Sequence, residues 1–322
     1  SCCFTRVLSL EHLAELARAH KTELNSKVRD FAIGKTHFDF NTTPHLMGVV
    51  NLSPDSWYQE SVCLTTESAI ERGKSLAKLG AALVDVGGES SVLDAERVEA
   101  NEQASRLVPV VRGLSGEGVA VSAETYDPAV AEACLKAGAA VINLTGPGEA
   151  EAIFQLVAKH DAAVIICFVQ GDHVRAVDDL ELGENPVGAM YEFFAREIDR
   201  AIKAGVERLF VDPGLGFGKS LGDNLALLGH LDIFSAIGCP VVVGASRKSF
   251  VWKPAGLTPK EALPGSLRTE GSAAIPWTQR DWHERVEPSE VGPSAVYLAK
   301  QDAQSMTGQL VMRAEFGETW GL

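Results

Sequence analysis

Seven short apolar runs recur along the chain, each bounded by Gly, Pro or Asn and separated from the next run by a longer amphipathic stretch. Apolar residues in these runs do not alternate with polar ones, which indicates strands buried on both faces of a parallel sheet. Seven strand–helix units in one direction exceed what most doubly wound sheets need, and an eighth unit would close a barrel. The predicted strands cover residues 45–51, 82–87, 119–123, 140–143, 163–168, 208–212 and 240–244.

The fold class that we predict is α/β, a (β/α)8 TIM barrel over residues 38–322 with an N-terminal helical extension over residues 1–37. Leucine and alanine recur at helical spacing between residues 9 and 32, which predicts a helix there. The strand–helix rhythm stops near residue 264, so residues 264–322 are expected to form an atypical last unit. The predicted helices between the strands include residues 67–79, 128–136, 187–204 and 223–231.

The charge and cysteine content limit the expected partners. A net charge of −14 argues against nucleic acid, because such a chain repels phosphate backbones at long range. No apolar run approaches the roughly 20 residues that span a bilayer, so no membrane association is expected. The six cysteines include no CxxC pair and no Cys/His cluster at zinc-ligand spacing, which favours a reducing, cytoplasmic location. Small molecules are therefore the expected ligands.

Polar residues follow the predicted strands rather than preceding them. In a barrel, residues at the carboxyl ends of the strands gather at one rim, where active sites of this fold lie. The alternative is that polar residues merely begin the loops, but carboxylates and lysines of buried type are costly at strand ends without a function. The polar positions are residues 51–55, 85–91, Glu124, Asn143, Gln170, Asp212 and residues 246–249.

Four segments, in this order along the chain, resemble the motifs of the dihydropteroate synthase family. They are MGVVNLSPDSW at residues 47–57, AALVDVGGESS at 81–91, VDPGLGFGK at 211–219 and GASRKSF at 244–250. The resemblance covers roughly residues 38–275. It implies a pterin-binding barrel that joins 6-hydroxymethyl-7,8-dihydropterin pyrophosphate to p-aminobenzoate, in folate biosynthesis, and releases pyrophosphate.

The resemblance also implies a pterin site. Asp212 matches the family carboxylate that accepts from the pterin amino group and ring nitrogen, and Lys248 matches the lysine that contacts the pterin carbonyl. Asn143 is expected at the same ring, and Glu124 stands where the family usually has Asp. The alternative for Asp212 is a purely structural role, in which its side chain caps the tight turn at Pro213.

A second group of residues is implied for the pyrophosphate and the second substrate. Asn51 matches a residue linked to Mg²⁺ and pyrophosphate, and Ser91 replaces the family threonine. Phe217, Ser246 and Arg247 match positions near the aminobenzoate, and Arg247 is an alternative partner for its carboxylate. Asn51 has a structural turn as its alternative role. Lys248, Asp212 and Arg247 are the implied catalytic residues, and solvated charges at the rim are the alternative for Arg247 and Lys248.

The sequence departs from the family pattern in two loops and in the last strand. Residues 92–94 read Val-Leu-Asp where the family usually has Arg-Pro-Gly, and residues 58–61 replace an Asp-Gly-Gly pattern. Both loops resemble those of the sulfonamide-resistance branch. The Arg-x-His-Asp motif of the last strand is missing, with Arg313 as the candidate for its arginine, and residues 288–311 look like the end of a short-chain dehydrogenase.

Two other classes of function remain open from the sequence. One is a pterin- or folate-binding homologue with a different acceptor or a methyl-transfer reaction, and the other is a non-catalytic pterin-binding protein. The resemblance also makes a homodimer plausible.

Overall fold

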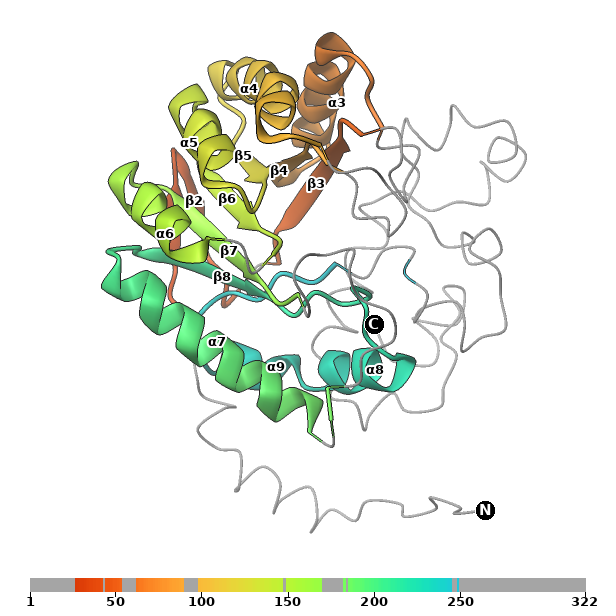
Figure 1. Ribbon diagram of the computed structural model, residues 1–322, viewed down its shortest axis with the longest axis vertical. Helices are drawn as coiled ribbons and strands as arrows, with labels where there is room; N and C mark the ends of the chain where they lie inside the picture. The colour runs from red at the N-terminus through yellow and green to blue at the C-terminus, as the bar shows by residue number, and fades with distance from the viewer. Residues whose placement is uncertain are drawn as a thin grey trace, which may run out of the picture.

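Six parallel strands form the centre of the fold in this computed structural model, in the order β3-β4-β5-β6-β7-β8 (Figure 1). They confirm six of the seven predicted strands, with ends that shift by at most two residues. The strands are β3 Leu46–Asn51, β4 Ala81–Gly87, β5 Val121–Glu124, β6 Val141–Leu144, β7 Ala163–Cys167 and β8 Arg208–Asp212. The structure describes residues 27–42, 44–53, 62–89, 98–146, 149–169, 182–183, 185–244 and 248.

The seventh predicted strand, residues 240–244, is present only as an isolated parallel bridge between Val211 and Val241. The backbone N–H of Val211 donates to Pro240 O at 3.0 Å, and that of Val242 donates to Val211 O at 2.8 Å. The segment therefore lies beside β8 in the position of a next barrel strand, but it is shorter than predicted. The predicted last unit, residues 264–322, lies outside the described residues.

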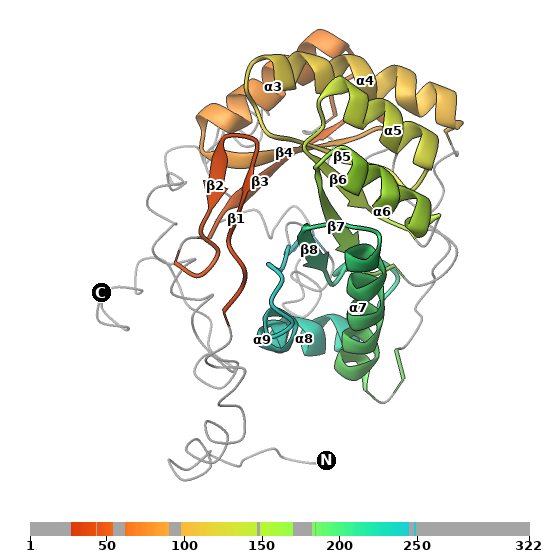
Figure 2. The same ribbon diagram turned by 90° about the vertical axis from the view of Figure 1, so that its left-hand side faces the viewer.

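Helices cover the outer face of the curved sheet, as the turned view shows (Figure 2). The predicted helices over residues 67–79, 128–136 and 187–204 are confirmed as α3, α5 and α7, whereas the one over 223–231 divides at His230 into two. The helices are α3 Thr66–Lys78, α4 Ala100–Gly116, α5 Pro128–Ala137, α6 Ala150–Lys159, α7 Pro186–Lys203, α8 Leu221–Gly229 and α9 Leu231–Ser235.

Local sequence signals fix the ends of these helices. Asp127 caps α5 because its Oδ1 atom accepts from two backbone N–H groups, at 2.8 and 3.1 Å, and Pro128 follows at the first helical position. Gly138 ends the helix with φ at 106°, a conformation that glycine adopts without strain. Thr65 and Ser68 form a reciprocal capping box at the start of α3.

The prediction of a helix reaching residue 32 is wrong at its end, because a β-hairpin forms instead. Its strands are β1 Phe31–Ile33 and β2 Thr36–Phe38, joined by a turn in which Gly34 has φ at 57°. The physical reason is burial: Ile33 and Phe38 are 3% and 2% exposed and pack against side chains at the amino end of the barrel. Residues 9–26 of the predicted helix lie outside the described residues.

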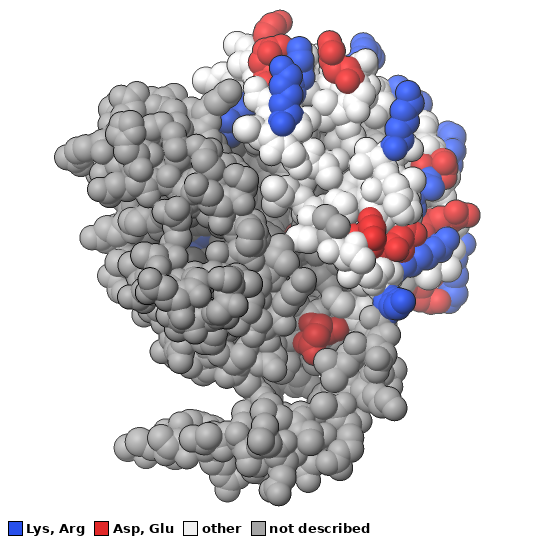
Figure 3. Space-filling view, turned by 180° about the vertical axis from the view of Figure 1, so that it is seen from behind, with Lys and Arg blue, Asp and Glu red and all other residues white. Residues whose placement is uncertain are grey.

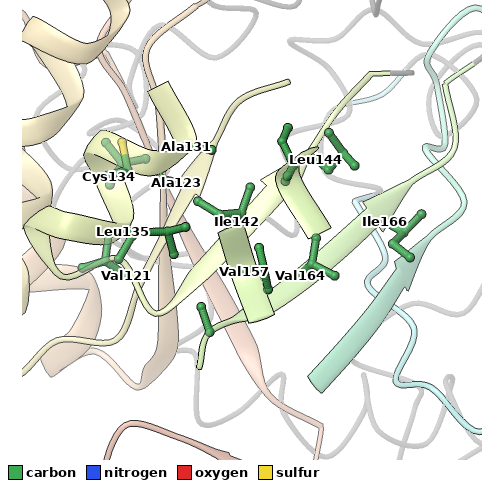
Figure 4. Packing of buried hydrophobic residues seen from close by; sticks show 14 of the residues in the cluster. Val121, Ala123, Ala131, Cys134, Leu135, Ile142, Leu144, Val157, Val164 and Ile166 are labelled. Carbon is green, nitrogen blue, oxygen red and sulfur yellow. The ribbon is translucent and has the colours of Figure 1, made fainter. Parts of the chain in front are cut away.

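The main core lies between the sheet and the helices. The outward-facing side chains of β5 and β6 are Val121, Ala123, Ile142 and Leu144, and each is at most 3% exposed (Figure 4). They pack with residues of α5 and α6 such as Cys134 into one continuous cluster. Burial on this scale is the main source of stability in such a fold.

Charged side chains of both signs lie interspersed on the described part of the surface seen in Figure 3. Several of them pair along a helix, as Glu132 does with Lys136 at 3.0 Å, and such exposed pairs contribute little to stability. Within the described chain, no helix combines the length and the apolar character that a membrane crossing requires.

Candidate functional site at the carboxyl ends of the strands

The inner face of the barrel changes from apolar to polar along most of the strands. Alternate residues of a strand point to opposite faces, so Leu83 and Asp85 share the inner face of β4, as Phe210 and Asp212 do on β8. Leu83 and Phe210 belong to the apolar cluster that the hairpin covers. Two residues further along each of these strands, at Asp85 and Asp212, the inner face is polar. We define the polar ring as Asn51, Asp85, Glu124, Asn143 and Asp212.

Four of the inner-facing rim residues are neighbours in the sheet register. Asn51 pairs with Gly87, Gly87 with Glu124, and Glu124 with Asn143. A Cβ atom at Gly87 would lie 2.5 Å from Glu124 Oε2 and 3.2 Å from Asn51 Oδ1, so the missing side chain gives both groups room. The other Glu124 oxygen accepts from the Thr145 hydroxyl at 3.1 Å. The predicted residues Asn51, Glu124 and Asn143 thus form one row.

Asp85 lies one layer deeper, and its role was not predicted. Its Oδ2 atom accepts from the side-chain Nδ2 of Asn143 at 3.2 Å, and Ser122 is its register neighbour on β5. Burial raises the pKa of Asp85 to about 6, the neighbouring Ser122 and Asn143 side chains oppose that shift, and the charge of Asp212 adds to it. A carboxylate with this pKa is mainly ionised above pH 7.

Asp212 ends β8 and holds the loop that follows. Its Oδ1 atom accepts from the backbone N–H of Gly214 at 2.7 Å, so the turn-capping role is confirmed. Gly214 has φ at 59°, and a Cβ atom there would clash with the backbone oxygen of Phe168, which only glycine avoids. Burial raises the pKa of Asp212, and the nearby cations Lys248 and Lys219 lower it. Turn capping does not exclude binding, because a carboxylate accepts several hydrogen bonds.

Lys248 reaches into the site over the loop after β8. Its Nζ atom donates to Leu215 O and lies 4.2 Å from the centre of the Phe217 ring. A Cβ atom at Gly216 would lie 2.7 Å from the lysine Cδ, so glycine leaves room for the chain of methylenes. Burial lowers the pKa of Lys248, whereas the charges of Asp212, Cys167 and Glu124 raise it. The predicted residues Glu124, Asp212 and Lys248 are therefore close enough to interact.

Lys219 is a second buried cation, and its role was not predicted. It is 6% exposed, and its Nζ atom donates to Gly214 O at 2.7 Å and to Phe217 O at 3.2 Å. The same atom lies 5.0 Å from the Phe168 ring at the end of β7. Burial lowers the pKa of Lys219 to about 8, opposed by the charges of Cys167 and Asp212. Lys219 thus ties the loop that carries Phe217 to the neighbouring strand.

The other predicted site residues lie outside the described residues. These are Ser91, Ser246, Arg247 and Arg313. Their roles remain predictions.

The described residues contain no group of three or more His, Cys, Asp or Glu side chains that would hold a metal ion by themselves. They do provide hard oxygen atoms at the rim, because Asn51 Oδ1 and Glu124 Oε2 lie on either side of Gly87. Mg²⁺ commonly takes one or two protein oxygens and completes its shell with phosphate and water. The donor set therefore fits Mg²⁺ brought together with a phosphorylated ligand.

A cavity of about 470 Å³ lies at the other end of the barrel. Its lining includes Arg29, Leu209 near the start of β8, and Gly238 in the loop before the seventh strand position. None of the polar ring residues contributes to it. The candidate site therefore lies at the end of the barrel opposite to this cavity.

A parallel sheet curved around a polar ring at its carboxyl edge defines the fold and site of a (β/α)-barrel enzyme. Comparison with known proteins narrows this class. A family model described as "Pterin binding enzyme" matches residues 47–277. The chain belongs to this family of pterin-binding enzymes.

Several relatives of the chain are named dihydropteroate synthase. The enzyme of Synechocystis sp. is 32% identical over 225 residues, which cover 69% of this chain and 78% of the relative. The solved enzyme of Xanthomonas albilineans with 4-aminobenzoic acid superposes with a TM-score of 0.65 at 28% identity, over 88% of this chain and 100% of that one. The Thermus thermophilus enzyme in complex with 6HMPPP gives a TM-score of 0.62 at 31% identity, over 85% and 100%. These matches confirm the predicted family and barrel class.

Proposed function

We propose that this chain is a transferase of folate biosynthesis that condenses 6-hydroxymethyl-7,8-dihydropterin pyrophosphate with p-aminobenzoate. The observation that carries the proposal is the arrangement of Glu124, Asn143, Asp212 and Lys248, which gathers hydrogen-bond acceptors around one cation at the active end of the barrel. Its relatives named dihydropteroate synthase support the same reaction.

The pterin ring fits this arrangement chemically. It has a guanidine-like edge of N–H donors and a carbonyl oxygen further round the ring. Asp212 is proposed to accept from the amino group and a ring N–H, Asn143 and Glu124 to complete the edge, and Lys248 to donate to the carbonyl. Because these groups are withdrawn from water, each hydrogen bond is stronger than it would be at the surface.

The chemical step breaks the bond between the pterin methylene carbon and the pyrophosphate oxygen, and the electron pair leaves with the pyrophosphate. The remaining carbon is positively charged in conjugation with the pterin, so the carboxylates of Asp212 and Glu124 favour it electrostatically. The aniline nitrogen of p-aminobenzoate then forms the new C–N bond and loses a proton.

The second substrate is proposed to lie near Phe217, Ser246 and Arg247, with Arg247 pairing with its carboxylate. The contact of Phe217 with Lys248 supports this placement, because it joins the two half-sites. Ser91 and Arg313 are proposed to contact the pyrophosphate, as the family resemblance implies.

The proposed cofactor is Mg²⁺, with Asn51 as its protein ligand. The position of Asn51 Oδ1 at the rim beside Gly87 supports this choice. When bound, the ion supplies charge that neutralises the departing pyrophosphate. The residues of the chain hold the pterin and the aminobenzoate in either case.

A homodimer in the cytoplasm is proposed as the working state. The support is the family resemblance, together with two exposed apolar side chains of α7, Tyr191 at 42% and Ile202 at 57% exposure. Light scattering of the purified chain tests it, and a monomer at micromolar concentration would exclude it. If α7 lies in the dimer interface, the Ile202→Glu variant is expected to be a monomer under the same conditions.

The experiment is the condensation assay itself, run with and without Mg²⁺, in which dihydropteroate and pyrophosphate are measured separately. Formation of both products in equal amounts supports the proposal. Release of pyrophosphate without dihydropteroate would mean that the acceptor is a compound other than p-aminobenzoate. Absence of both products from folded protein would overturn the proposed reaction. The Asp212→Ala variant is the control, and it is expected to lose pterin binding.

A further inference from the structure

Asp85 and Asn143 form a buried pair that the proposed reaction does not use directly. They come from β4 and β6, lie 58 residues apart in sequence, and are 5% and 7% exposed. Their hydrogen bond runs from Asn143 Nδ2 to Asp85 Oδ2 at 3.2 Å. Both side chains belong to the polar ring, and Asp85 lies on the side away from the rim.

We infer that Asp85 is a positioning residue that fixes the side-chain amide of Asn143 so that its carbonyl oxygen, and not its NH2 group, faces the ligand. An amide has one accepting end and one donating end, whereas an ionised carboxylate only accepts. The end of Asn143 that meets Asp85 must therefore be the donor. The acceptor Oδ1 is left for the ligand.

The accounting of buried polar atoms supports this orientation. Among the described residues, six buried side-chain nitrogen and oxygen atoms have no hydrogen-bond partner in the protein, and Asn143 Oδ1 and Asp85 Oδ1 are two of them. A buried acceptor without a partner is costly, and in native proteins such atoms usually have a functional explanation. An oxygen reserved for a donor on the ligand supplies that explanation for Asn143.

The consequence is a rule for the ligand. With the Asn143 amide fixed, the side chains of the pterin half-site offer acceptors from Glu124, Asn143 and Asp212 and one donor from Lys248. A ligand that fits must bring several N–H donors along one edge and an acceptor on another. A ring nitrogen that only accepts is rejected at Asn143, because two acceptors would face each other. The identification of this ligand as a pterin rests on the proposed function, but the amide orientation does not.

The test exchanges the two members of the pair. In Asp85→Asn, residue 85 can donate or accept, so the orientation of Asn143 is no longer fixed. In Asn143→Asp, two carboxylates meet. In the double variant that carries both changes, the amide now at position 85 donates and the carboxylate now at position 143 accepts, and an oxygen of residue 143 again faces the ligand. Cys134→Ala is the control, because it removes a buried atom of α5 in the core outside the sheet and contacts neither Asp85 nor Asn143.

Binding of 6-hydroxymethyl-7,8-dihydropterin is measured by calorimetry for all five proteins, after circular dichroism shows that each is folded. Each single exchange is expected to weaken binding roughly tenfold or more, as for a hydrogen bond to a charged group, and the double variant is expected to recover most of the loss. Cys134→Ala is expected to stay within about threefold of the wild type. Wild-type affinity in Asp85→Asn, or no recovery in the double variant, would overturn the inference.

A second measurement separates this inference from the proposed function. If the wild type binds no pterin, the proposed function fails, and the orientation is decided by the side-chain NH2 resonances of Asn143, assigned by their loss in Asn143→Asp. An NH2 group bonded to a carboxylate is expected to shift clearly when Asp85 is replaced in Asp85→Asn. Unchanged resonances would show that the NH2 group does not face Asp85 and would overturn the inference.

Discussion

Glu124 reaches across Gly87, so that its Oε2 atom lies 2.5 Å from the point that a Cβ atom at residue 87 would occupy. A Gly87→Ala substitution therefore displaces the Glu124 carboxylate. We expect the variant to lose roughly 100-fold in kcat/KM, because displacements of about 1 Å cost rates of this order. Steady-state kinetics of dihydropteroate formation check this.

Gly48→Ala is the control for this prediction. A Cβ atom at Gly48 would meet Leu76 at 3.0 Å on the outer face of β3, away from the polar ring. It is expected to lower the free energy of unfolding by about 1 kcal/mol or more through overpacking, while kcat/KM stays near that of the wild type. Equal kinetic losses in both variants would mean that Gly87 acts through stability alone.

The affinity for the pterin is expected to follow a bell-shaped pH profile. Binding needs Asp85 and Asp212 ionised and Lys248 protonated. Burial raises the pKa of Asp212, so as the pH falls, binding is lost at a pH above the usual aspartate pKa of about 3.9. Burial lowers the pKa of Lys248, so as the pH rises, binding is lost at a pH below the usual lysine pKa of about 10.4. Fluorescence titration between pH 4 and 11 measures both limbs.

The matched variant for the alkaline limb is Lys248→Arg, because a guanidinium keeps its proton throughout this range. In this variant the alkaline loss of pterin affinity is expected to move to higher pH, even if the affinity at pH 7 falls. If the alkaline loss stays at the same pH, a group other than Lys248 causes it.

The strands and their polar ends were predictable because their signal is local. Residues 163–168 are apolar throughout, and such a run needs only to be buried on both faces. The role of Lys219 was not predictable in the same way. A lysine in a glycine-rich loop suggests a solvated charge, and its burial depends on Phe168, which lies 51 residues earlier, at the end of β7.

The N-terminal hairpin was missed for a similar reason. Phe31 contacts Phe210 with ring centres 5.1 Å apart. This packing between distant segments favours a strand at Phe31, although the residues before it have the spacing of a helix. Asp85 and Asn143 were both visible as polar strand residues, but their hydrogen bond was not, because it depends on the pairing of β4, β5 and β6.

Phe38→Ala tests whether the hairpin stabilises the fold by covering the apolar residues at the amino end of the barrel. Phe38 is 2% exposed and stacks on Phe40 with ring centres 5.6 Å apart. The substitution is expected to lower the free energy of unfolding by about 3–5 kcal/mol, as for other buried phenylalanines. Urea unfolding measures the loss. Pterin affinity at about 10 °C should stay near that of the wild type, and a large loss of affinity would mean that the hairpin shapes the site as well.

Lys219→Met tests the buried cation under the loop after β8. The folded pKa of about 8 lies below the ordinary lysine value of 10.5, so the unfolded state binds more protons between these values, and wild-type stability rises with pH across that window. The rise is about 3 kcal/mol at most, and the variant should lack it. Urea unfolding at pH 7.5 and 9.5 measures the difference.

The same variant is expected to lose roughly tenfold or more in kcat/KM, because the carbonyl groups of Gly214 and Phe217 lose their common donor. Unchanged kinetics would mean that the loop keeps its position without Lys219. An unchanged pH dependence of stability would mean that the lysine is solvated.

Asp85→Asn is expected to make the protein more stable while it weakens pterin binding. The folded pKa of about 6 lies above the ordinary aspartate value of 3.8, so the folded state binds more protons between these values and wild-type stability falls as the pH rises through them. The ionised carboxylate then costs about 3 kcal/mol at pH 7.5, and the neutral amide avoids this cost. Urea unfolding at pH 7.5 should show the variant to be more stable, with a difference that shrinks towards pH 4. A variant less stable than the wild type at pH 7.5 would show that the carboxylate serves the fold. A gain in stability together with a loss of affinity would show that the buried charge is kept for the ligand.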